Sequence, residues 1–467
     1  MNDRTVLIQP DRGQTAITIH LTDKAALPAL LRPLTDGQRA VIAANKFEGA
    51  PGEVVIVPDG QGWHVLAGID PRETLGTWCL ARLAEVLPGG TYRVATPGLR
   101  IGPAFVGWIC AQYRFDRYKA EGPRTEPRVL LTQEAKAIAP ALAEAGAIAL
   151  VRDLVNTPAE DMGPAQLELE ARALVKTFGA EIHVVAGDAL ERDYPMVHAV
   201  GRAAARHHAP RLIELTWGDA KHPRVAIVGK GVCFDSGGLD LKPSSGMALM
   251  KKDMGGAAHA LALARLVMER ALPVRLHLLV PAVENAVSGN AMRPGDVLRS
   301  RQGLTIEITN TDAEGRLVLG DALTRACETP PDILIDFATL TGAARVALGP
   351  DLPAMFARSD STATAIAAAG IRADDPVWRL PLYEGYREYM KSDVADMVNS
   401  APNGFAGAST AALFLDRFVA EGVDWVHFDT FAWRPAAKPG RPKGGEALGL
   451  RAAWGLLVSR FGDSPAA

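Results

Sequence analysis

Acidic and lysine side chains gather in three short segments of this chain. Lys230 and Asp235 follow directly after an apolar run, Asp253 follows two lysines, and Asp312 and Glu314 lie two residues apart. Paired glycines come after Asp235, and glycine allows a backbone to approach another group closely. Carboxylates grouped in this way can hold a divalent cation, provided that the fold brings the three segments together.

The segment Asn310 to Leu317 carries the strongest single signal. It follows a predicted hairpin, Val297 to Thr309, which turns near Gly303, and it leads into a helical stretch. An Asp-x-Glu-Gly run can belong to a calcium loop, but the EF-hand pattern requires more oxygen ligands and a late Glu, whereas Arg316 follows here. The other alternative is a solvated turn of mixed charge; the apolar residues that follow favour a tightly built loop.

The earlier segments also have simpler interpretations. Asp253 begins a predicted helix, where a carboxylate complements the helix dipole. A phosphate loop at Gly229-Lys230-Gly231 is not supported, because the GxxxxGK[ST] spacing is absent. A serine hydrolase is not supported either, since the chain has no Gly-x-Ser-x-Gly turn. Core or surface roles are expected for four histidines: His207, His208, His259 and His277.

The elements that must position these residues are strands alternating with helices. Most of the strand-like runs are separated by helical stretches, which predicts a mostly parallel or mixed sheet covered by helices. In such sheets ligands bind beyond the carboxyl ends of the strands, where Lys230 and Asp235 are placed. The predicted strands are 181–185, 212–215, 225–228, 275–280, 333–337 and 424–428.

The chain is long enough for two α/β domains of unequal size. Residues 1–131 are predicted to form a smaller N-terminal α/β domain, with strands at Glu53–Pro58 and Trp63–Gly68. Residues 132–158 are predicted to form a connecting helix, for which Thr132 is the candidate N-cap. Residues 159–467 are assigned to the larger catalytic domain.

Bulk properties restrict the partners and the compartment. The 50 Lys and Arg residues nearly balance the 53 Asp and Glu residues, so no overall field favours nucleic acid or an anionic membrane. The four cysteines form no CxxC pair, which argues against a zinc knuckle and fits a reducing compartment. The start of the chain lacks a secretory signal pattern, and charges interrupt the apolar stretch 257–287. We therefore expect a cytoplasmic protein with no membrane partner.

These segments together resemble the leucyl aminopeptidase (cytosol aminopeptidase) family, peptidase family M17. The octet Asn310–Leu317 matches the family's signature, and five other segments match in the same order and at agreeing spacings. The resemblance covers the last two thirds of the chain well, whereas the N-terminal domain matches poorly and residues 433–450 depart from the family's pattern. The five segments are 228–231, 234–238, 242–243, 253–256 and 338–343.

The resemblance implies two divalent metal ions, Zn or Mn, with Mg or Co as alternatives. Asp235 and Glu314 would bridge both ions, Asp312 would complete one site, and Lys230 with Asp253 would complete the other. The four negative charges of the carboxylates balance the four positive charges of two divalent cations if Lys230 is neutral. A neutral lysine near pH 7 needs its pKa lowered from ~10.4 to ~7, which requires a strong partner such as a bound cation.

The same resemblance implies an aminopeptidase in which a metal-bound water attacks the peptide carbonyl and the metals bind a free α-amine. Lys242 would stabilise the developing oxyanion, and Arg316 would hold bicarbonate, the family's general base. The substrates would be peptides with a free N-terminus, and the assembly would be a homohexamer. A first side-chain pocket that prefers Leu or other apolar residues would be formed by Met250, Thr339, Leu340, Gly342 and Ala343.

Two other functions remain open on this fold. One is a dipeptidase, such as a Cys-Gly hydrolase, which only a substrate panel would distinguish. The other is a scaffold or DNA-binding protein, although no basic stripe supports it and no nucleic-acid partner is expected.

Overall fold

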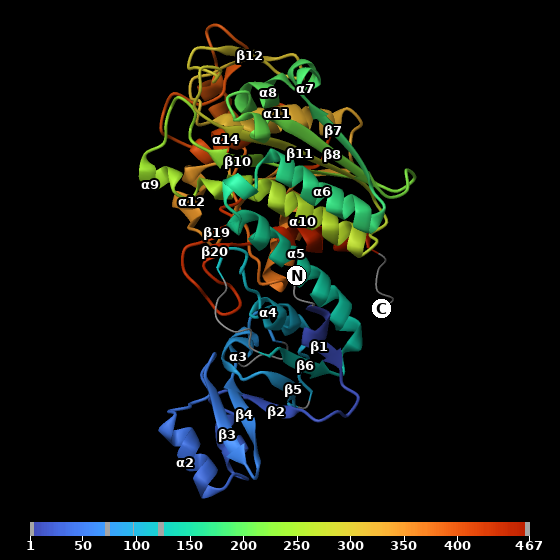
Figure 1. Ribbon diagram of the computed structural model, residues 1–467, viewed down its shortest axis with the longest axis vertical. Helices are drawn as coiled ribbons and strands as arrows, with labels where there is room; N and C mark the ends of the chain where they lie inside the picture. Colours follow the sequence, from blue (N-terminus) through green and yellow to red (C-terminus); the bar gives the residue numbers. More distant parts are fainter. Residues whose placement is uncertain (1–3, 71–74, 97, 120–125, 463–467) are drawn as a thin grey trace. The chain divides into compact units, whose positions relative to one another are not determined.

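A computed structural model describes residues 4–70, 75–96, 98–119 and 126–462. Its contacts divide the chain into two units, each with its own sheet (Figure 1). Unit 1 comprises Met1–Ala149 and Ala436–Pro442, and unit 2 comprises Leu150–Pro435 and Lys443–Ala467. The first change from one unit to the other thus falls inside the predicted connector, between Ala149 and Leu150, and the chain returns to unit 1 only over Ala436–Pro442.

Unit 1 contains a six-stranded sheet with the order β1-β6-β5-β2-β4-β3. All neighbouring strands are parallel except β3 and β4, which form an antiparallel hairpin where two strands were predicted from the sequence. The strands are β1 (Ile8–Pro10), β2 (Ile17–Thr22), β3 (Val54–Asp59), β4 (Gly62–Gly68), β5 (Gly90–Val94) and β6 (Arg128–Thr132). The helices are α1 (Leu27–Leu31), α2 (Asp36–Ala44), α3 (Ala81–Val86) and α4 (Phe105–Cys110).

The connecting helix begins later than the sequence predicted. Residues 128–132 pair as strand β6 with β1 and β5, so Thr132 ends a strand and does not cap a helix. Its Oγ1 accepts a hydrogen bond from the backbone N–H of Glu134 (2.9 Å), which starts the turn out of the sheet. A short 3-10 turn, Ala135–Ala137, then leads into α5 (Ile138–Asn156). The prediction of Thr132 as the N-cap was therefore wrong, because strand pairing outweighed the helical composition around it.

Unit 2 contains a nine-stranded mixed sheet. Its main path runs β16-β15-β18-β14-β9-β11-β8-β7, and β10 pairs with β11 beside that path. The four central strands, β18, β14, β9 and β11, are parallel, whereas β7, β8 and β15 join their inner neighbours in antiparallel fashion. All six strands predicted for this part of the chain are present, and the predicted hairpin forms as β12 and β13 in a separate small sheet.

The strands of unit 2 are β7 (Glu181–Ala186), β8 (Arg211–Trp217), β9 (Arg224–Gly229), β10 (Gly231–Asp235), β11 (Arg275–Asn285), β12 (Val297–Arg299), β13 (Thr305–Glu307), β14 (Ile333–Ala338), β15 (Ala354–Ala357), β16 (Trp378–Arg379), β17 (Met397–Val398), β18 (Trp425–Asp429), β19 (Trp433–Arg434) and β20 (Gly444–Gly445). Its α-helices after α5 are α6 (Pro164–Phe178), α7 (Asp188–Asp193), α8 (Pro195–Gly201), α9 (Ser244–Met247), α10 (Gly255–Glu269), α11 (Glu314–Cys327), α12 (Gly342–Leu348), α13 (Asp360–Arg372), α14 (Gly407–Asp416) and α15 (Leu450–Phe461).

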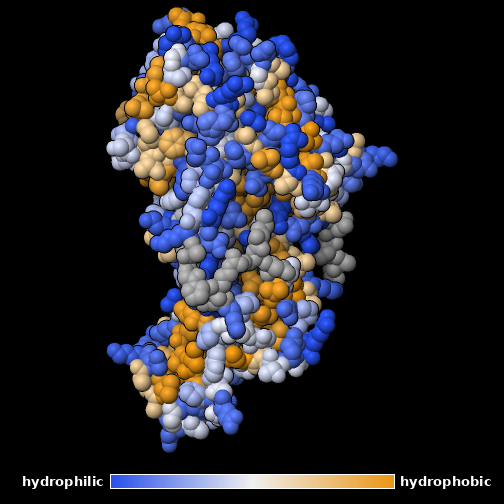
Figure 2. All heavy atoms as spheres, in the orientation of Figure 1, coloured by the Kyte–Doolittle hydropathy of each residue, from blue (hydrophilic) through white to orange (hydrophobic). Residues whose placement is uncertain are grey.

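Helices cover both faces of the central strands. Helix α10 contacts β9, β11 and β14 and lies beside α6 (Figure 1), whereas α8, α11 and α14 share a buried core with the opposite side chains of the same strands. Strands β9 and β14 are almost entirely buried, which explains why they are apolar apart from Arg224 and Asp336. On the face of unit 2 seen in Figure 2, hydrophobic side chains are interspersed among hydrophilic ones. No helix in the described ranges is both long enough and apolar enough to cross a membrane.

The carboxyl ends of β9, β14 and β18 meet at one edge of the sheet, and the N-terminus of α10 is packed against two of them. A Cβ at Gly256 would lie 2.2 Å from the backbone oxygen of Phe337, so only glycine allows this approach. The backbone N–H groups of Lys230 and Ala257 donate to the carbonyls of Phe337 (3.0 Å) and Lys230 (2.8 Å). This packing places Lys230 at the junction of two strands and a helix.

Candidate metal centre

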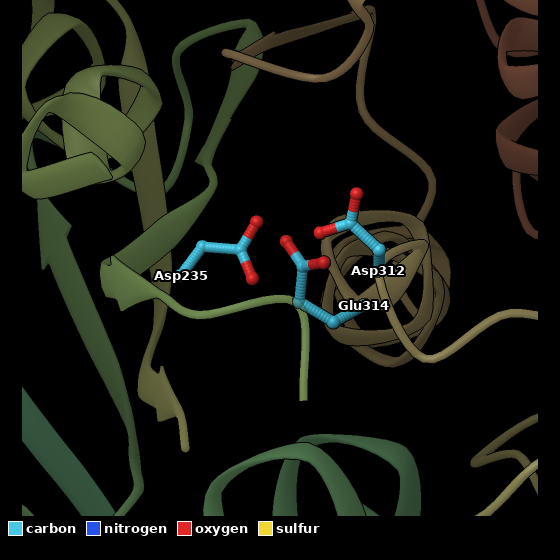
Figure 3. A group of neighbouring side chains, drawn as sticks. All are labelled: Asp235, Asp312 and Glu314. Carbon is cyan, nitrogen blue, oxygen red and sulfur yellow. The ribbon is translucent and has the colours of Figure 1, made fainter. Parts of the chain in front are cut away.

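Three carboxylates converge at this edge of the sheet. Asp235 is the last residue of β10, Asp312 lies in the loop before α11, and Glu314 is the first residue of α11. One oxygen from each lies within 4.8 Å of the others, and the three side chains point toward one another (Figure 3). Asp235 and Glu314 are buried, whereas 34% of the Asp312 side chain is exposed. The structure therefore joins carboxylates from two of the three segments.

The electrostatics of this cluster suit a cation. Burial and the nearby charge of Asp235 raise the pKa values of both Asp312 and Glu314. Glu314 Oε2 is buried and accepts no hydrogen bond from any described residue. A buried acceptor without a donor is costly, and a metal ion would supply its missing partner. The donor set, with carboxylate oxygens and a neighbouring amine, thus fits a divalent metal ion.

Two lysines lie against the carboxylates. Lys230 Nζ is 2.6 Å from Asp253 Oδ2 and 2.9 Å from Glu314 Oε1. Lys242 Nζ is 2.7 Å from Asp235 Oδ2 and also pairs with Asp312 Oδ1. Burial alone would lower the pKa of each lysine, but the adjacent carboxylates raise both above the usual range. Without a bound cation, both lysines are therefore charged.

Asp253 belongs to the 3-10 turn Met250–Met254, directly before α10, and is held by three donors. Besides Lys230, it accepts hydrogen bonds from Thr339 Oγ1 (2.7 Å) and from Lys252 Nζ (3.1 Å). Burial would raise its pKa, but the charges of Lys230 and Lys252 lower it. Asp253 is thus linked to the three-carboxylate cluster through Lys230.

Backbone and amide groups fix the orientation of Asp235. Its Oδ1 accepts hydrogen bonds from Gly237 N (2.9 Å) and from Asn285 Nδ2 (2.9 Å). Asn285 also donates to the carbonyl of Thr311 (3.1 Å), and Thr311 Oγ1 donates to the carbonyl of Gly237 (2.6 Å). These bonds join the Asp235 loop to the loop that carries Asp312.

Asn399, which follows β17, holds the same loop from the other side. Its side-chain oxygen accepts from the backbone N–H groups of Thr309 (2.9 Å) and Asn310 (3.2 Å), and its Nδ2 donates to the carbonyls of Asn310 (2.7 Å) and Ala313 (3.4 Å). The backbone carbonyl of Asn399 accepts from Arg316 Nη1 (2.8 Å). One fully buried residue therefore positions both the loop and the arginine.

Arg316 is a buried cation at the edge of the cluster. Burial lowers its pKa to about 10, against the opposing charges of Glu314 and Asp429, so the guanidinium remains charged near neutral pH. Its Nε has no hydrogen-bond partner among the described residues. It can therefore donate to an anion.

All the residues proposed from the sequence border one pocket. Lys230, Asp235, Asp253, Asp312 and Glu314 line it, together with Lys242 and Arg316. The expected side-chain pocket residues Met250, Thr339, Leu340, Gly342 and Ala343 line the same space. On the C-terminal side the lining stops at Phe431, so residues 433–450, which depart from the family's pattern, are not part of it.

Several residues around this pocket had not been selected from the sequence. Asn285 could have been found, because it is a polar residue at the end of a long apolar strand. Asn399 and Asp429, which accepts hydrogen bonds from the backbone of Leu340 and Thr341, carried no comparable local signal. Lys252, Arg345 and Phe431 also line the pocket and also lie outside the motifs.

Comparison with known proteins agrees with this site. The catalytic domain of the cytosol aminopeptidase family matches residues 149–453, and the M17 aminopeptidase N-terminal domain matches residues 17–131. The second match corrects the expectation that the N-terminal domain resembles the family poorly. That part carries no site motif, so a comparison based on motifs could not detect it.

Individual relatives extend over most of the chain. A probable cytosol aminopeptidase of Rhodococcus opacus is 40% identical over 444 residues, which is 90% of this chain and 86% of the relative. The crystal structure of the cytosol aminopeptidase of Coxiella burnetii has a TM-score of 0.92 and 45% identity and covers 97% of this chain and 99% of that one. The bottromycin maturation enzyme BotP in complex with Mn has a TM-score of 0.84 and 34% identity, covering 96% and 99%. The chain therefore belongs to the cytosol aminopeptidase family and is a metallo-aminopeptidase, a hydrolase of peptides.

Proposed function

We propose that this chain uses two divalent metal ions to release the N-terminal residue of peptides, with Leu or another apolar residue preferred. The observation that carries the proposal is the convergence of Asp235, Asp312 and Glu314, of which Asp235 and Glu314 are buried and one Glu314 oxygen lacks a donor among the described residues. Asp253 and Lys230 border the same pocket and are joined to this group by the ion pair of Lys230 with Glu314. Asp253 and Lys230 would supply ligand atoms for a second metal ion.

The ligand assignment is the one that resemblance to the family implies, and the charges and positions of the residues support it. Asp235, Asp312 and Glu314 would hold one ion, and Lys230 and Asp253 would complete a second site that shares Asp235 and Glu314. Four carboxylates balance two divalent cations if Lys230 gives up its proton when a cation replaces it as the partner of the carboxylates. Zn and Mn both suit these ligands, with Mg or Co as alternatives, and the Mn complex of BotP supports Mn.

When bound, such ions supply an activated water, polarise the peptide carbonyl and accept a free amine. The protein adds a cation, Lys242, which is held protonated by Asp235 and Asp312 and lines the pocket. A protonated lysine in this position donates to the oxygen on which negative charge develops. We assign this role to Lys242.

Arg316 cannot act as a base, because its guanidinium stays charged. Its anchored Nη1 and unpartnered Nε leave it suited to hold a planar anion by two parallel hydrogen bonds. By its resemblance to the family, that anion is bicarbonate, which would accept the proton from the attacking water. Arg316 is thus a holder of the base.

The side chain of the first residue would lie among Met250, Thr339, Leu340, Gly342 and Ala343. Met250 is buried at the pocket wall, while Gly342 and Ala343 are exposed at the start of α12 and leave room above the helix. An apolar side chain gains free energy in such a space by leaving water. We further propose, from family membership, a homohexamer located in the cytoplasm; light scattering on the purified protein tests the assembly.

The decisive experiment removes and restores the metal. We expect chelation by EDTA to abolish leucine release from leucyl 4-nitroanilide, and Mn or Zn to restore it with two ions per chain by elemental analysis. An N-acetylated substrate should remain uncut, since its amine is blocked. Full activity after exhaustive metal removal would overturn the proposal, and saturation at one ion per chain would overturn the two-ion assignment. A panel of dipeptides and longer peptides separates an aminopeptidase from a dipeptidase.

A further inference from the structure

One wall of the pocket contains an aromatic ring with two cations near it. Phe431 follows β18, and its ring centre lies 5.8 Å from Lys252 Nζ and 4.9 Å from Arg345 Cζ. All three residues line the same pocket as the candidate metal ligands. A cation over an aromatic face gains only about 0.5–1 kcal/mol at an exposed site, so the ring orients these groups without neutralising them.

The charges on this wall are incompletely paired. Lys252 is buried and shares Asp253 with Lys230. Arg345 has neither an ion pair nor a side-chain hydrogen bond among the described residues, and its recorded contact is the Phe431 ring. Asp429, a further carboxylate that lines the pocket, accepts hydrogen bonds from Thr341 Oγ1 (2.6 Å) and from two backbone N–H groups, and no ion pair joins it to Arg345. Arg345 therefore brings to the pocket a guanidinium that no carboxylate of the described residues pairs with.

Arg345 also lies where the first side chain of a substrate is expected. It is three residues after Gly342 on α12, and residues three apart lie on the same face of a helix. A Cβ added at Gly342 would be 3.9 Å from Arg345 Nη2, so the guanidinium extends over the space that this glycine leaves open. If the apolar part of the substrate's first side chain rests against Gly342 and Met250, the end of that side chain would point toward Arg345.

We propose that this wall, with Arg345 as the principal donor, binds a carboxylate of the substrate. The position of Arg345 above Gly342 favours the side-chain carboxylate of an N-terminal Glu as the source. The C-terminal carboxylate of a dipeptide has the same chemistry and is the other source. In either case the guanidinium fork donates two parallel hydrogen bonds to the two oxygens. This inference rests on the function proposed above, and it adds acidic substrates to the apolar ones.

The test compares matched substrates in the metal-loaded enzyme and in two variants. The substrates are the 4-nitroanilides of Glu, Gln and Leu, which have no C-terminal carboxylate, and the peptides Leu-Gly and Leu-Gly-amide. The variants are Arg345→Met and, as a control for loss of one surface charge, Arg372→Met, an exposed arginine at the end of α13 that does not line the pocket. Thermal unfolding checks that each variant is folded.

We expect Arg345→Met to lower kcat/KM for the Glu substrate about tenfold, as for loss of a charge-assisted hydrogen bond, and to leave Gln and Leu within about twofold. If the C-terminal carboxylate is the source, the loss falls instead on Leu-Gly relative to Leu-Gly-amide. Equal Glu/Gln and peptide/amide ratios in all three proteins would overturn the inference while leaving the proposed function intact. If the metal-loaded protein cuts none of these substrates, the proposed function fails, and calorimetric binding of free Glu and Gln to the same proteins decides the inference.

Discussion

At the scale of single residues, the candidate metal centre depends on the absence of a side chain at Gly315. Gly315 is the second residue of α11, and a Cβ there would lie 2.6–2.8 Å from the Cδ, Cε and Nζ atoms of Lys230. Lys230 is buried and held between Asp253 and Glu314, so it has little freedom to move away. The glycine therefore leaves the space that the Lys230 amine occupies.

We predict that Gly315→Ala lowers both activity and stability. The added methyl group displaces Lys230, so metal affinity and kcat/KM should fall by about tenfold or more, as for a misplaced group in a catalytic site. Overpacking costs about 1–3 kcal/mol, which outweighs the gain of up to about 1 kcal/mol of alanine over glycine in a helix, so the melting temperature should fall. Steady-state kinetics, metal titration and thermal unfolding check this.

Gly320→Ala in the same helix is the matched control. A Cβ there meets Met196 Cε at 2.8 Å and the ring of Phe418 at 3.2 Å, away from the pocket. We expect it to cost about 1 kcal/mol or more of stability by overpacking, with kinetics unchanged. Equal losses of activity in both variants would contradict the role given to Gly315.

The residues that could be foreseen from the sequence are those with a local signal. Asp312 and Glu314 lie in one motif, and Lys230 and Asp235 flank a recognisable strand end, so their proximity could be expected. Arg345 and Lys252 had no such signal. Their relevance depends on Phe431, which follows β18, a strand that the sheet brings beside β14, and only tertiary structure creates that neighbourhood.

At the scale of elements, the loop before α11 depends on a residue from another part of the chain. Asn399 forms side-chain bonds to Thr309, Asn310 and Ala313, while β17 beside it pairs in parallel with β13. The loop is thus fixed both by the ladder of the small sheet and by one amide side chain. Because Arg316 is bound to the Asn399 carbonyl, movement of this strand would also move the guanidinium.

We predict that Asn399→Ala destabilises the protein by about 2–4 kcal/mol, because buried backbone groups of the loop lose their partners. Asp312 and Arg316 lose their support at the same time, so kcat should fall more than KM rises. Asn399→Asp keeps the acceptor for Thr309 and Asn310 but places a carboxylate oxygen against the carbonyls of Asn310 and Ala313, so it should destabilise the protein at least as much as alanine does. Urea unfolding and steady-state kinetics on all three proteins provide the measurement. Lower stability with unchanged kcat would limit Asn399 to a structural role.

The strands were predicted best where a largely apolar run is long enough to be recognised, and least well where the strand is short. The six strands predicted for the large sheet of unit 2 formed where the sequence indicated, whereas the short strands β15, β16, β17, β19 and β20 were not predicted. Thr132 was assigned to the start of the connecting helix, yet residues 128–132 pair as β6 between β1 and β5. Strand pairing is a long-range interaction, and local composition does not encode it.

At the scale of the whole molecule, buried charges link distant elements to stability. Glu214 on β8 accepts hydrogen bonds from His277 on β11 (2.8 Å) and from Arg325 on α11 (2.9 Å). Burial alone would raise the pKa of Glu214, but these two hydrogen bonds outweigh it and lower the pKa from 4.5 to about 2. The folded state therefore favours the ionised form of Glu214.

This gives a pH dependence of definite sign. A carboxyl whose pKa is lower in the folded state contributes stability that is complete above about 4.5 and is lost as the pH falls toward about 2. The contribution is at most about 3 kcal/mol. We predict that Glu214→Gln reduces stability at pH 7 and removes part of the decline between pH 5 and 3. Urea unfolding at several pH values measures this, and parallel curves for the two proteins would contradict it.

The order of strands in the sheet of unit 2 also affects how the protein is made. Strand β18 lies between β14 and β15 and pairs with both, although it follows them in the sequence by many residues. During synthesis, which proceeds from the N-terminus, β14 and β15 leave the ribosome with unpaired edges and keep them until residues 425–429 emerge. Such edges are templates for aggregation. The nascent chain is therefore most in need of chaperones late in its synthesis, and a stop codon just before residue 425 would yield an aggregation-prone fragment with a gap inside its sheet.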